Sequence, residues 1–322
     1  MQAAPRLNAL MISLLTILPL AGVGGAMYMH QQNIPNGQLA GIVAAFLIEA
    51  GLFLATGSAA ARERLGALAP VRVAAALTLI TPVTWLLAGG GELWQLAGTV
   101  AITAFFAFWY LWFPETDTPV LLVFGAVALL KASAVLYFVP WPKAPTPIIG
   151  EFAWLRTFLF AVLLFRRPVI EKFGFIPTAE EWKQGVKWWA LFIPVALAVG
   201  VPIGFAKLRP LPADMGKLAL SVIGTFLGHF IFVALREEIV FRAMLLGKLK
   251  QYMGAGVGLA VSAVVFGAVH LPFGHFPNWR FALVAAIAGY FYAKSYQATG
   301  SVRSAMITHA LTNVVARVFL ST

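Results

Sequence analysis

Long apolar runs separated by short polar connections occupy almost the whole chain. A bilayer core requires about 20 apolar residues in a helix. Eleven stretches reach or approach that length, at about residues 8–28, 38–60, 72–90, 94–113, 120–141, 152–166, 187–206, 222–248, 256–274, 281–298 and 302–320. The pattern predicts an all-α, polytopic transmembrane helix bundle. The first run has the early charge of a signal peptide, but Pro19 and several glycines interrupt it, so we expect a retained anchor.

Two polar connections organise these spans. Residues 142–151 form a proline-rich loop, and we place a boundary there, with N-terminal transmembrane helices of unknown role over 1–148 and a second domain over 149–322. Residues 167–187 are amphipathic and rich in aromatic side chains, which is typical of a short interfacial helix. Thr178 and Glu181 have the spacing of a capping box that would open this helix.

Composition supports a lipid environment. Of 322 residues, 61% are hydrophobic and 11% are charged, against about 25% charged in a soluble domain. The net charge of +11 comes from Lys and Arg in short loops, which indicates topology and contact with anionic lipid and not nucleic acid. Their distribution favours a cytoplasmic N-terminus in a multi-pass protein of the cytoplasmic membrane. The absence of cysteine excludes a thiolate nucleophile and a Cys-type zinc site.

Three of the predicted spans contain ionisable and polar residues. A charged side chain at the bilayer centre costs about 2.5–3.5 kcal/mol on insertion scales, so several of them in nearby spans indicate function. The residues are Glu237, Glu238, Arg242, His270, His309 and Asn313. At 1.5 Å of rise per residue, the acidic, imidazole and carboxamide groups lie about 14 to 21 Å from the inner helix ends, which permits a single cluster.

The segment Arg236-Glu-Glu-Ile-Val-Phe-Arg242 carries the two carboxylates. Glu238 and Arg242 are four residues apart and can pair on one helix face, which leaves Glu237 free to accept a proton. An ion pair at a helix end is the alternative interpretation.

His270 follows Phe266 by four residues in an apolar run, and on its own it is better explained as a hydrogen-bonded core residue than as a catalyst. His309 and Asn313 share one helix face and can both donate hydrogen bonds to a developing oxyanion. A polar seam between helices would explain the last pair without catalysis.

The motifs E-E-x-x-x-R, F-x-x-x-H and H-x-x-x-N, in this order on successive hydrophobic segments, resemble the CPBP family of intramembrane proteases. That family comprises CAAX prenyl protease 2 (Rce1-type) and the bacterial Abi and bacteriocin-processing proteins. The stretch from Gly300 to His309 is also similar to the family's approach to its last motif. The resemblance covers about residues 218–320, and it makes 149–322 the expected catalytic transmembrane domain.

The resemblance implies an intramembrane endopeptidase. Glu237 and His270 would activate a water, and His309 with Asn313 would stabilise the tetrahedral oxyanion. Glu238 and Arg242 would support the site. The expected substrate is a peptide or protein, prenylated or a leader peptide. We favour a mechanism without a cofactor; the alternative is zinc held by Glu237, His270 and His309.

Two other classes of function remain open. Glu49, Lys131 and Arg156 are also charged residues within predicted spans, and such residues often mark the pathway of a transporter or channel. No inverted repeat accompanies them, and we expect them to pair between helices. A non-catalytic scaffold or immunity protein is the second alternative.

Overall fold

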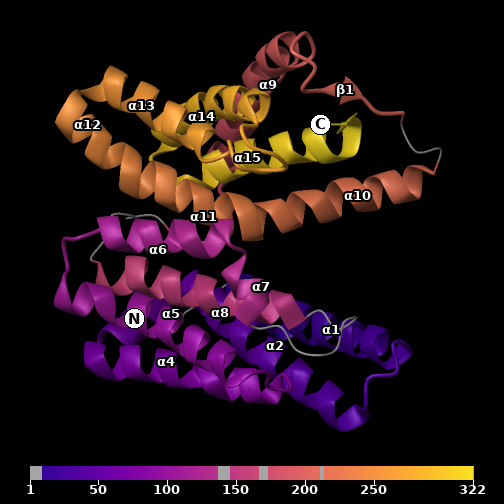
Figure 1. Ribbon diagram of the computed structural model, residues 1–322, viewed down its shortest axis with the longest axis vertical. Coiled ribbons are helices and arrows are strands. Elements are labelled where there is room, and N and C mark those ends of the chain that lie inside the picture. The colour runs from indigo at the N-terminus through magenta and orange to yellow at the C-terminus, as the bar shows by residue number, and fades with distance from the viewer. Residues whose placement is uncertain (1–8, 137–145, 167–172, 211–213, 322) are drawn as a thin grey trace, which may run out of the picture. The chain divides into compact units, whose positions relative to one another are not determined.

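The computed structural model describes residues 9–136, 146–166, 173–210 and 214–321. Nearly all of the described residues are helical, which confirms the all-α prediction (Figure 1). The chain divides into two compact units, Met1–Val169 and Ile170–Thr322, and the domain boundary expected at residue 149 stays a prediction.

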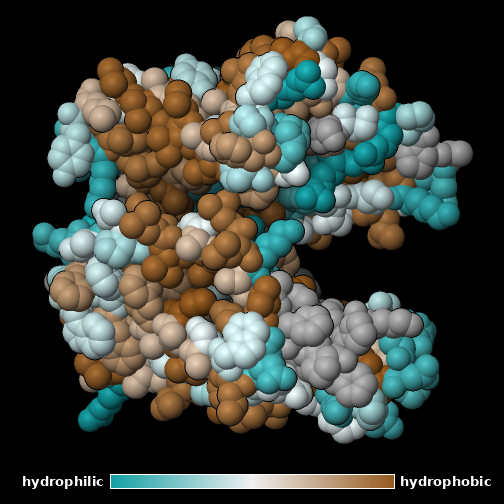
Figure 2. Space-filling view, in the orientation of Figure 1, coloured by the Kyte–Doolittle hydropathy of each residue, from teal (hydrophilic) through white to brown (hydrophobic). Residues whose placement is uncertain are grey.

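Five described helical stretches are long and apolar enough to cross a membrane. They are Asn36–Thr56, Pro70–Leu87, Leu93–Trp112, Ile148–Phe165 and Met215–Met253. The expected total of eleven spans is therefore not yet confirmed. Apolar side chains cover much of the visible surface (Figure 2), and leucines such as Leu79, Leu122 and Leu220 are exposed. Lipid solvates such side chains, so their exposure is consistent with a membrane-embedded bundle.

The described residues of the first unit form a series of helices. They are α1 (Ala9–Gln31), α2 (Asn36–Thr56), α3 (Ala59–Gly66), α4 (Pro70–Leu87), α5 (Leu93–Trp112), α6 (Thr118–Leu129), α7 (Ala132–Leu136) and α8 (Thr146–Phe160), which continues as the π-helical turn η1 (Ala161–Phe165). Helix α8 packs against α2, α5 and α7 and is mostly buried. The run predicted at 120–141 is broken between α6 and α7, where Lys131 takes a positive φ of 48°.

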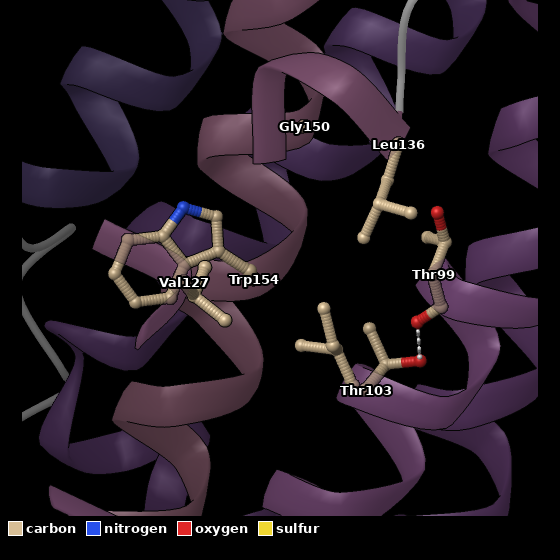
Figure 3. A pocket seen from close by; sticks show the side chains of 7 residues that line it. Thr99, Thr103, Val127, Leu136, Gly150 and Trp154 are labelled. Carbon is tan, nitrogen blue, oxygen red and sulfur yellow. Dashed lines mark hydrogen bonds between the residues drawn. The ribbon is translucent and has the colours of Figure 1, made fainter. Parts of the chain in front are cut away.

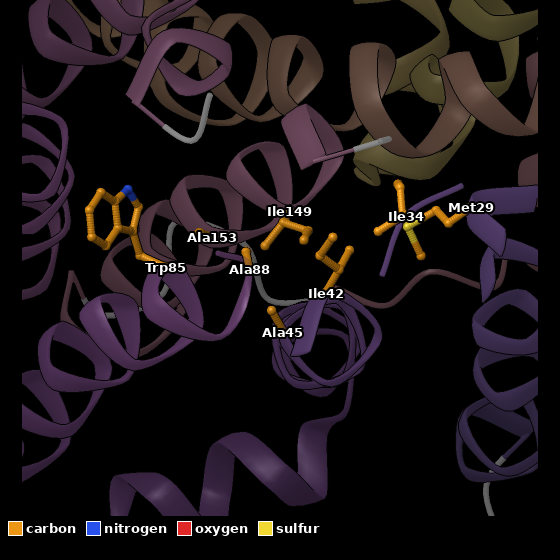
Figure 4. Packing of buried hydrophobic residues seen from close by; sticks show 8 residues of the cluster. All are labelled: Met29, Ile34, Ile42, Ala45, Trp85, Ala88, Ile149 and Ala153. Carbon is orange, nitrogen blue, oxygen red and sulfur yellow. The ribbon is translucent and has the colours of Figure 1, made fainter. Parts of the chain in front are cut away.

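Apolar packing around α8 is drawn in Figure 4. The cluster brings together Met29, Ile34, Ile42, Ala45, Trp85, Ala88, Ile149 and Ala153. A second contact region encloses a cavity of about 10 Å³ beside Thr99, Thr103 and Trp154 (Figure 3). The hydroxyl of Thr103 donates to the backbone oxygen of Thr99 at 2.9 Å, so these polar groups are satisfied within their own helix.

Glu49 and Arg156 form a buried ion pair between α2 and α8, as predicted. The guanidinium also donates to Thr81 Oγ1 at 2.9 Å, and Thr84 Oγ1 donates to the carboxylate at 2.6 Å. Both charged side chains are 0% exposed. Lys131 was expected to join them, but it is exposed in the turn between α6 and α7. The two charges are therefore satisfied within one buried network, which is consistent with a structural role.

The second unit contains α9 (Ala179–Gly200), a long helical segment, and three further helices. The long segment runs through α10 (Met215–Gly228), η2 (His229–Ala234), α11 (Leu235–Glu238), η3 (Ile239–Leu246) and α12 (Gly247–Met253), and is followed by α13 (Ala255–Ala268), α14 (Trp279–Thr299), α15 (Val302–Val314) and η4 (Val315–Phe319). Strands β1 (Lys207–Leu208) and β2 (Leu320–Ser321) pair antiparallel. Helix α15 packs against α9, α14 and η2.

The capping box predicted at Thr178 and Glu181 is present and opens α9. The N–H of Thr178 donates to Glu181 Oε2 at 2.6 Å, and the amphipathic first turns continue without a break to Gly200. Arg303, in the first turn of α15, donates to Glu181 Oε1 at 2.8 Å. Burial alone would raise the pKa of the Glu181 carboxyl, but hydrogen bonds from Ser301, Thr178 and Arg303 hold it below its ordinary value.

Candidate active site

The two glutamates lie on α11, between the π-helical stretches η2 and η3. π-helical turns inside α-helices are rare and are frequent at functional sites, because the extra residue redirects the side chains that follow. Met215–Met253 nevertheless forms one apolar segment of 39 residues. The two carboxylates therefore lie on a long helical segment that is apolar enough to cross a membrane, at a place where π-helical turns interrupt the regular α-helix.

Glu238 links two charged partners. Its Oε2 lies 2.8 Å from Arg242 Nε, which confirms the pairing predicted from their i, i+4 spacing. Its Oε1 lies 2.9 Å from His309 Nδ1. Both Glu238 and Arg242 are 0% exposed. Because a carboxylate accepts, the geometry assigns the Nδ1 proton to His309 and points Nε2 of the same ring away from Glu238.

Aromatic rings surround the guanidinium of Arg242. Its Cζ lies 4.8 Å from the ring centroid of Phe266, 5.7 Å from Tyr292 and 5.9 Å from Phe241. None of its nitrogens meets the angular geometry of a hydrogen bond, although Nε is at ion-pair distance from Glu238. The π faces of these rings and one carboxylate thus balance the buried positive charge.

Glu237 has the opposite environment from its neighbour. Its side chain is 22% exposed, and its Oε2 is buried without a hydrogen-bond partner among the described residues. This oxygen lies 3.9 Å from His309 Nε2. That separation is too long for a hydrogen bond. A water or substrate oxygen about 2.8 Å from both Glu237 Oε2 and His309 Nε2 could form a hydrogen bond with each of them. The geometry therefore suits a carboxylate and an imidazole that act on one shared oxygen.

His270 lies in the turn after α13 and not within a helix. The helix predicted over 256–274 ends at Ala268, because Pro272 disfavours helical backbone at the residue before it. His270 Nδ1 lies 2.7 Å from the backbone oxygen of Phe266. The carbonyl can only accept, so Nδ1 carries the proton and the neutral ring presents a free Nε2. Glu237 and His309 both lie within electrostatic range of this imidazole.

Asn313 lies on α15, one turn beyond His309, and is partly buried. The i, i+4 relation predicted from the sequence holds, because residues 302–314 form a regular α-helix. Within the described part of the chain its carboxamide forms no hydrogen bond that would tie it to another group. Asn313 is therefore available as a donor on the face of α15 that carries His309. His275, five residues after His270, is exposed in the loop after α13.

A buried polar seam holds α15 in place behind the site. Thr308 Oγ1 donates to the backbone oxygen of Gly185 on α9 at 2.9 Å and also meets Ser295 Oγ on α14 at 2.9 Å. Ser304 Oγ donates to the backbone oxygen of Ser295 at 2.8 Å. The polar seam that was the alternative explanation for His309 thus exists, but it is built from hydroxyls on neighbouring positions.

Two residues that the sequence did not single out lie beside the site. His229, on η2, has its Nδ1 2.8 Å from Thr225 O and lies within electrostatic range of Glu237 and His309. Its place in a predicted span, eight residues before Glu237, was a usable signal. Tyr292 stacks on His309 with centroids 4.6 Å apart. An aromatic residue in an apolar helix gives no such signal.

The alternative zinc site would require Glu237, His270 and His309 as ligands. Among the described residues, no three His, Cys, Asp or Glu side chains converge closely enough to hold a metal ion. His309 Nδ1 is already bonded to Glu238, so only its Nε2 could serve as a ligand. As they stand, the side chains do not fit a His₂Glu zinc centre.

The region that carries the site is similar to a known protein family. Residues 219–315 match the family model for type II CAAX prenyl endopeptidases, Rce1-like. No curated protein and no solved structure matches the chain. The family match confirms the resemblance predicted from the three motifs and includes all six candidate residues. This family indicates a protease, and together with the apolar helices it supports an integral membrane protein.

Proposed function

We propose that this chain is an intramembrane endopeptidase that hydrolyses a peptide bond with a water activated by Glu237. One observation carries the proposal: a buried, unpartnered oxygen of Glu237 faces His309 Nε2 at 3.9 Å, within helices apolar enough for a bilayer. A buried carboxylate oxygen without a partner is costly, so it indicates a place where substrate or water is bound.

The reaction divides between an activating and a stabilising pair. Glu237, assisted by His270 Nε2, accepts a proton from water while the water oxygen forms a bond to the peptide carbonyl carbon. The carbonyl π electrons move to oxygen, and His309 with Asn313 donates hydrogen bonds to that oxyanion. When the C–N bond breaks, the electron pair goes to nitrogen, and Glu237 returns the proton to the leaving amine.

His309 can donate from Nε2 only as an imidazolium, because its Nδ1 proton is already directed at Glu238. The Glu238 carboxylate lies 2.9 Å from Nδ1 of this ring, and Arg242 holds the carboxylate in place at 2.8 Å. The supporting role of both residues follows from that arrangement. His270, in contrast, suits proton acceptance, since its Nδ1–H is fixed on the Phe266 carbonyl.

The substrate proposal extends from the family match. A peptide or protein is the expected substrate, and the type II CAAX prenyl endopeptidase description favours one that carries a prenylated cysteine near its C-terminus. Basic inner loops would attract a substrate that arrives along an anionic leaflet. The transporter alternative has no comparable support, since the buried charges of the first unit close on each other.

The test uses the purified full chain in lipid vesicles with a panel of prenylated and unprenylated peptides. Glu237→Gln keeps the shape of the side chain but removes the base, so cleavage should fall at least about 100-fold. Glu180→Gln, an exposed glutamate of α9, is the matched control and should retain full activity. Full cleavage by Glu237→Gln would refute the proposal.

The same vesicles test the absence of a metal. Cleavage should persist after chelator treatment and dialysis. Loss of cleavage that is restored by added Zn²⁺ would replace the glutamate mechanism with a metal-dependent one.

A further inference from the structure

The imidazole of His309 is restrained on its face as well as at Nδ1. Tyr292, on α14, is 2% exposed and stacks against the imidazole with centroids 4.6 Å apart and an interplanar angle of 19°. Phe266 meets the same imidazole edge-on at 6.0 Å and 83°. The Glu238 contact alone would still allow the ring to pivot about that bond. The stacked phenol removes this freedom and fixes the direction in which Nε2 points.

The ring of Tyr292 also suits a positive charge on the imidazole. Its π face lies against His309 and within 5.7 Å of the Arg242 guanidinium. Aromatic faces attract cations more strongly in desolvated sites. A leucine of similar bulk would fill the space without supplying this attraction, so the aromatic ring has a purpose beyond packing.

We propose that Tyr292 is a positioning residue for the oxyanion-stabilising site: its ring, stacked on the imidazole, orients His309. This inference rests on the proposed peptidase function. It adds a residue outside the three sequence motifs, on a helix that contributes none of the motif residues.

The experiment compares three variants of the full chain in vesicles. Tyr292→Leu removes the stack, and kcat should fall about 10- to 100-fold with KM within about twofold, as for other residues that orient a reacting group. Tyr292→Phe keeps an aromatic ring against the imidazole, so its kcat should stay within about threefold of the wild type. Tyr290→Leu is the matched control, because Tyr290 lies on the same helix but is 41% exposed, and it should match the wild type.

Wild-type kcat in Tyr292→Leu would overturn the stacking role. A loss in Tyr292→Phe as large as that in Tyr292→Leu would also overturn it, because the ring is still present in Tyr292→Phe. If Tyr292→Leu does not fold, Tyr292→Met takes its place, because a flexible side chain also removes the stack.

A second readout does not depend on catalysis. The ring-proton NMR signal of His309, assigned by its loss in His309→Gln, should shift in Tyr292→Leu and not in Tyr290→Leu. An unchanged signal in Tyr292→Leu would contradict the stack. Glu237→Gln is measured in parallel: if it remains active the proposed function fails, whereas normal Tyr292 variants beside an inactive Glu237→Gln remove only the positioning role.

Discussion

Gly185→Ala should displace α15 and so lower kcat, although Gly185 is not one of the motif residues. Gly185 lies on α9, where its backbone oxygen accepts from Thr308 on α15 at 2.9 Å. A Cβ added at Gly185 would lie 2.6 Å from Cβ and 2.7 Å from Cγ2 of Ile307, and 2.9 Å from the backbone oxygen of Ser304. Two of these three atoms belong to the backbone or its first side-chain atom, so rotation of a side chain cannot relieve the overlap.

The geometry sets the size of the effect. Ordinary contact begins at 3.4 Å, so α9 and α15 would have to separate by about 0.8 Å. Overpacking of this kind destabilises by about 1–3 kcal/mol. His309 lies two residues after Ile307, so the shift reaches the imidazole almost undiminished. Misplacing a reacting group by about 1 Å can lower the rate about 100-fold, and we expect kcat to fall about 10- to 100-fold.

Gly224→Ala is the matched control. Gly224 lies in α10, is exposed, and has no atom within 4 Å of an added Cβ. Both variants gain about 1 kcal/mol of helix propensity. The difference between them therefore isolates the steric term of about 1–3 kcal/mol. Thermal unfolding in detergent measures stability, and peptide cleavage in vesicles measures kcat.

Equal unfolding temperatures for Gly185→Ala and Gly224→Ala would refute the close contact between α9 and α15. A normal kcat in a destabilised Gly185→Ala would refute a narrower point, the dependence of the site on the exact placement of α15.

Three further predictions follow from buried and interfacial charges. Glu238→Gln weakens the contact that orients His309, so kcat should fall about 10- to 100-fold, and an unchanged kcat would count against the proposed role. The same change leaves Arg242 buried without an anionic partner, so the melting temperature should also fall. Glu49→Leu leaves Arg156 buried and unpaired, which should destabilise the first unit by about 3–5 kcal/mol in detergent unfolding, and a neutral result would contradict the ion pair. Because the pKa of Glu181 is lowered in the folded protein, its carboxylate stabilises the fold at pH values above the unfolded-state pKa of about 4.3. This stability is lost as pH falls through the folded-state pKa, so the free energy of unfolding should fall less steeply at acid pH in Glu181→Gln.

The sequence predicted those features that depend on local spacing. The i, i+4 pairing of Glu238 with Arg242 and the capping box of Thr178 need only one helix, and both are present. The contact of Glu238 with His309 joins residues 71 positions apart, and it depends on how α15 packs against α11. No periodicity within either helix encodes that packing, so the partner of the buried carboxylate could only be found in three dimensions.

Some features that we did not predict from the sequence had a local signal, and others did not. Pro272 indicates the end of α13 near Ala268, so the placement of His270 in a turn was predictable from the residue order. The role inferred for Tyr292 had no such signal. Its ring is one of many aromatic side chains in apolar helices, and only the stack on His309 distinguishes it from ordinary packing.

The different roles proposed for the two glutamates rest on their surroundings and not on their residue type. Glu237 and Glu238 are adjacent and chemically identical, so their sequence positions give no physical reason to assign one as the base. Glu238 is 0% exposed, and its two oxygens lie 2.8 Å from Arg242 Nε and 2.9 Å from His309 Nδ1. Glu237 is partly exposed and has a buried oxygen without a partner. A base must have a free lone pair within reach of water, and of the two only Glu237 meets that requirement.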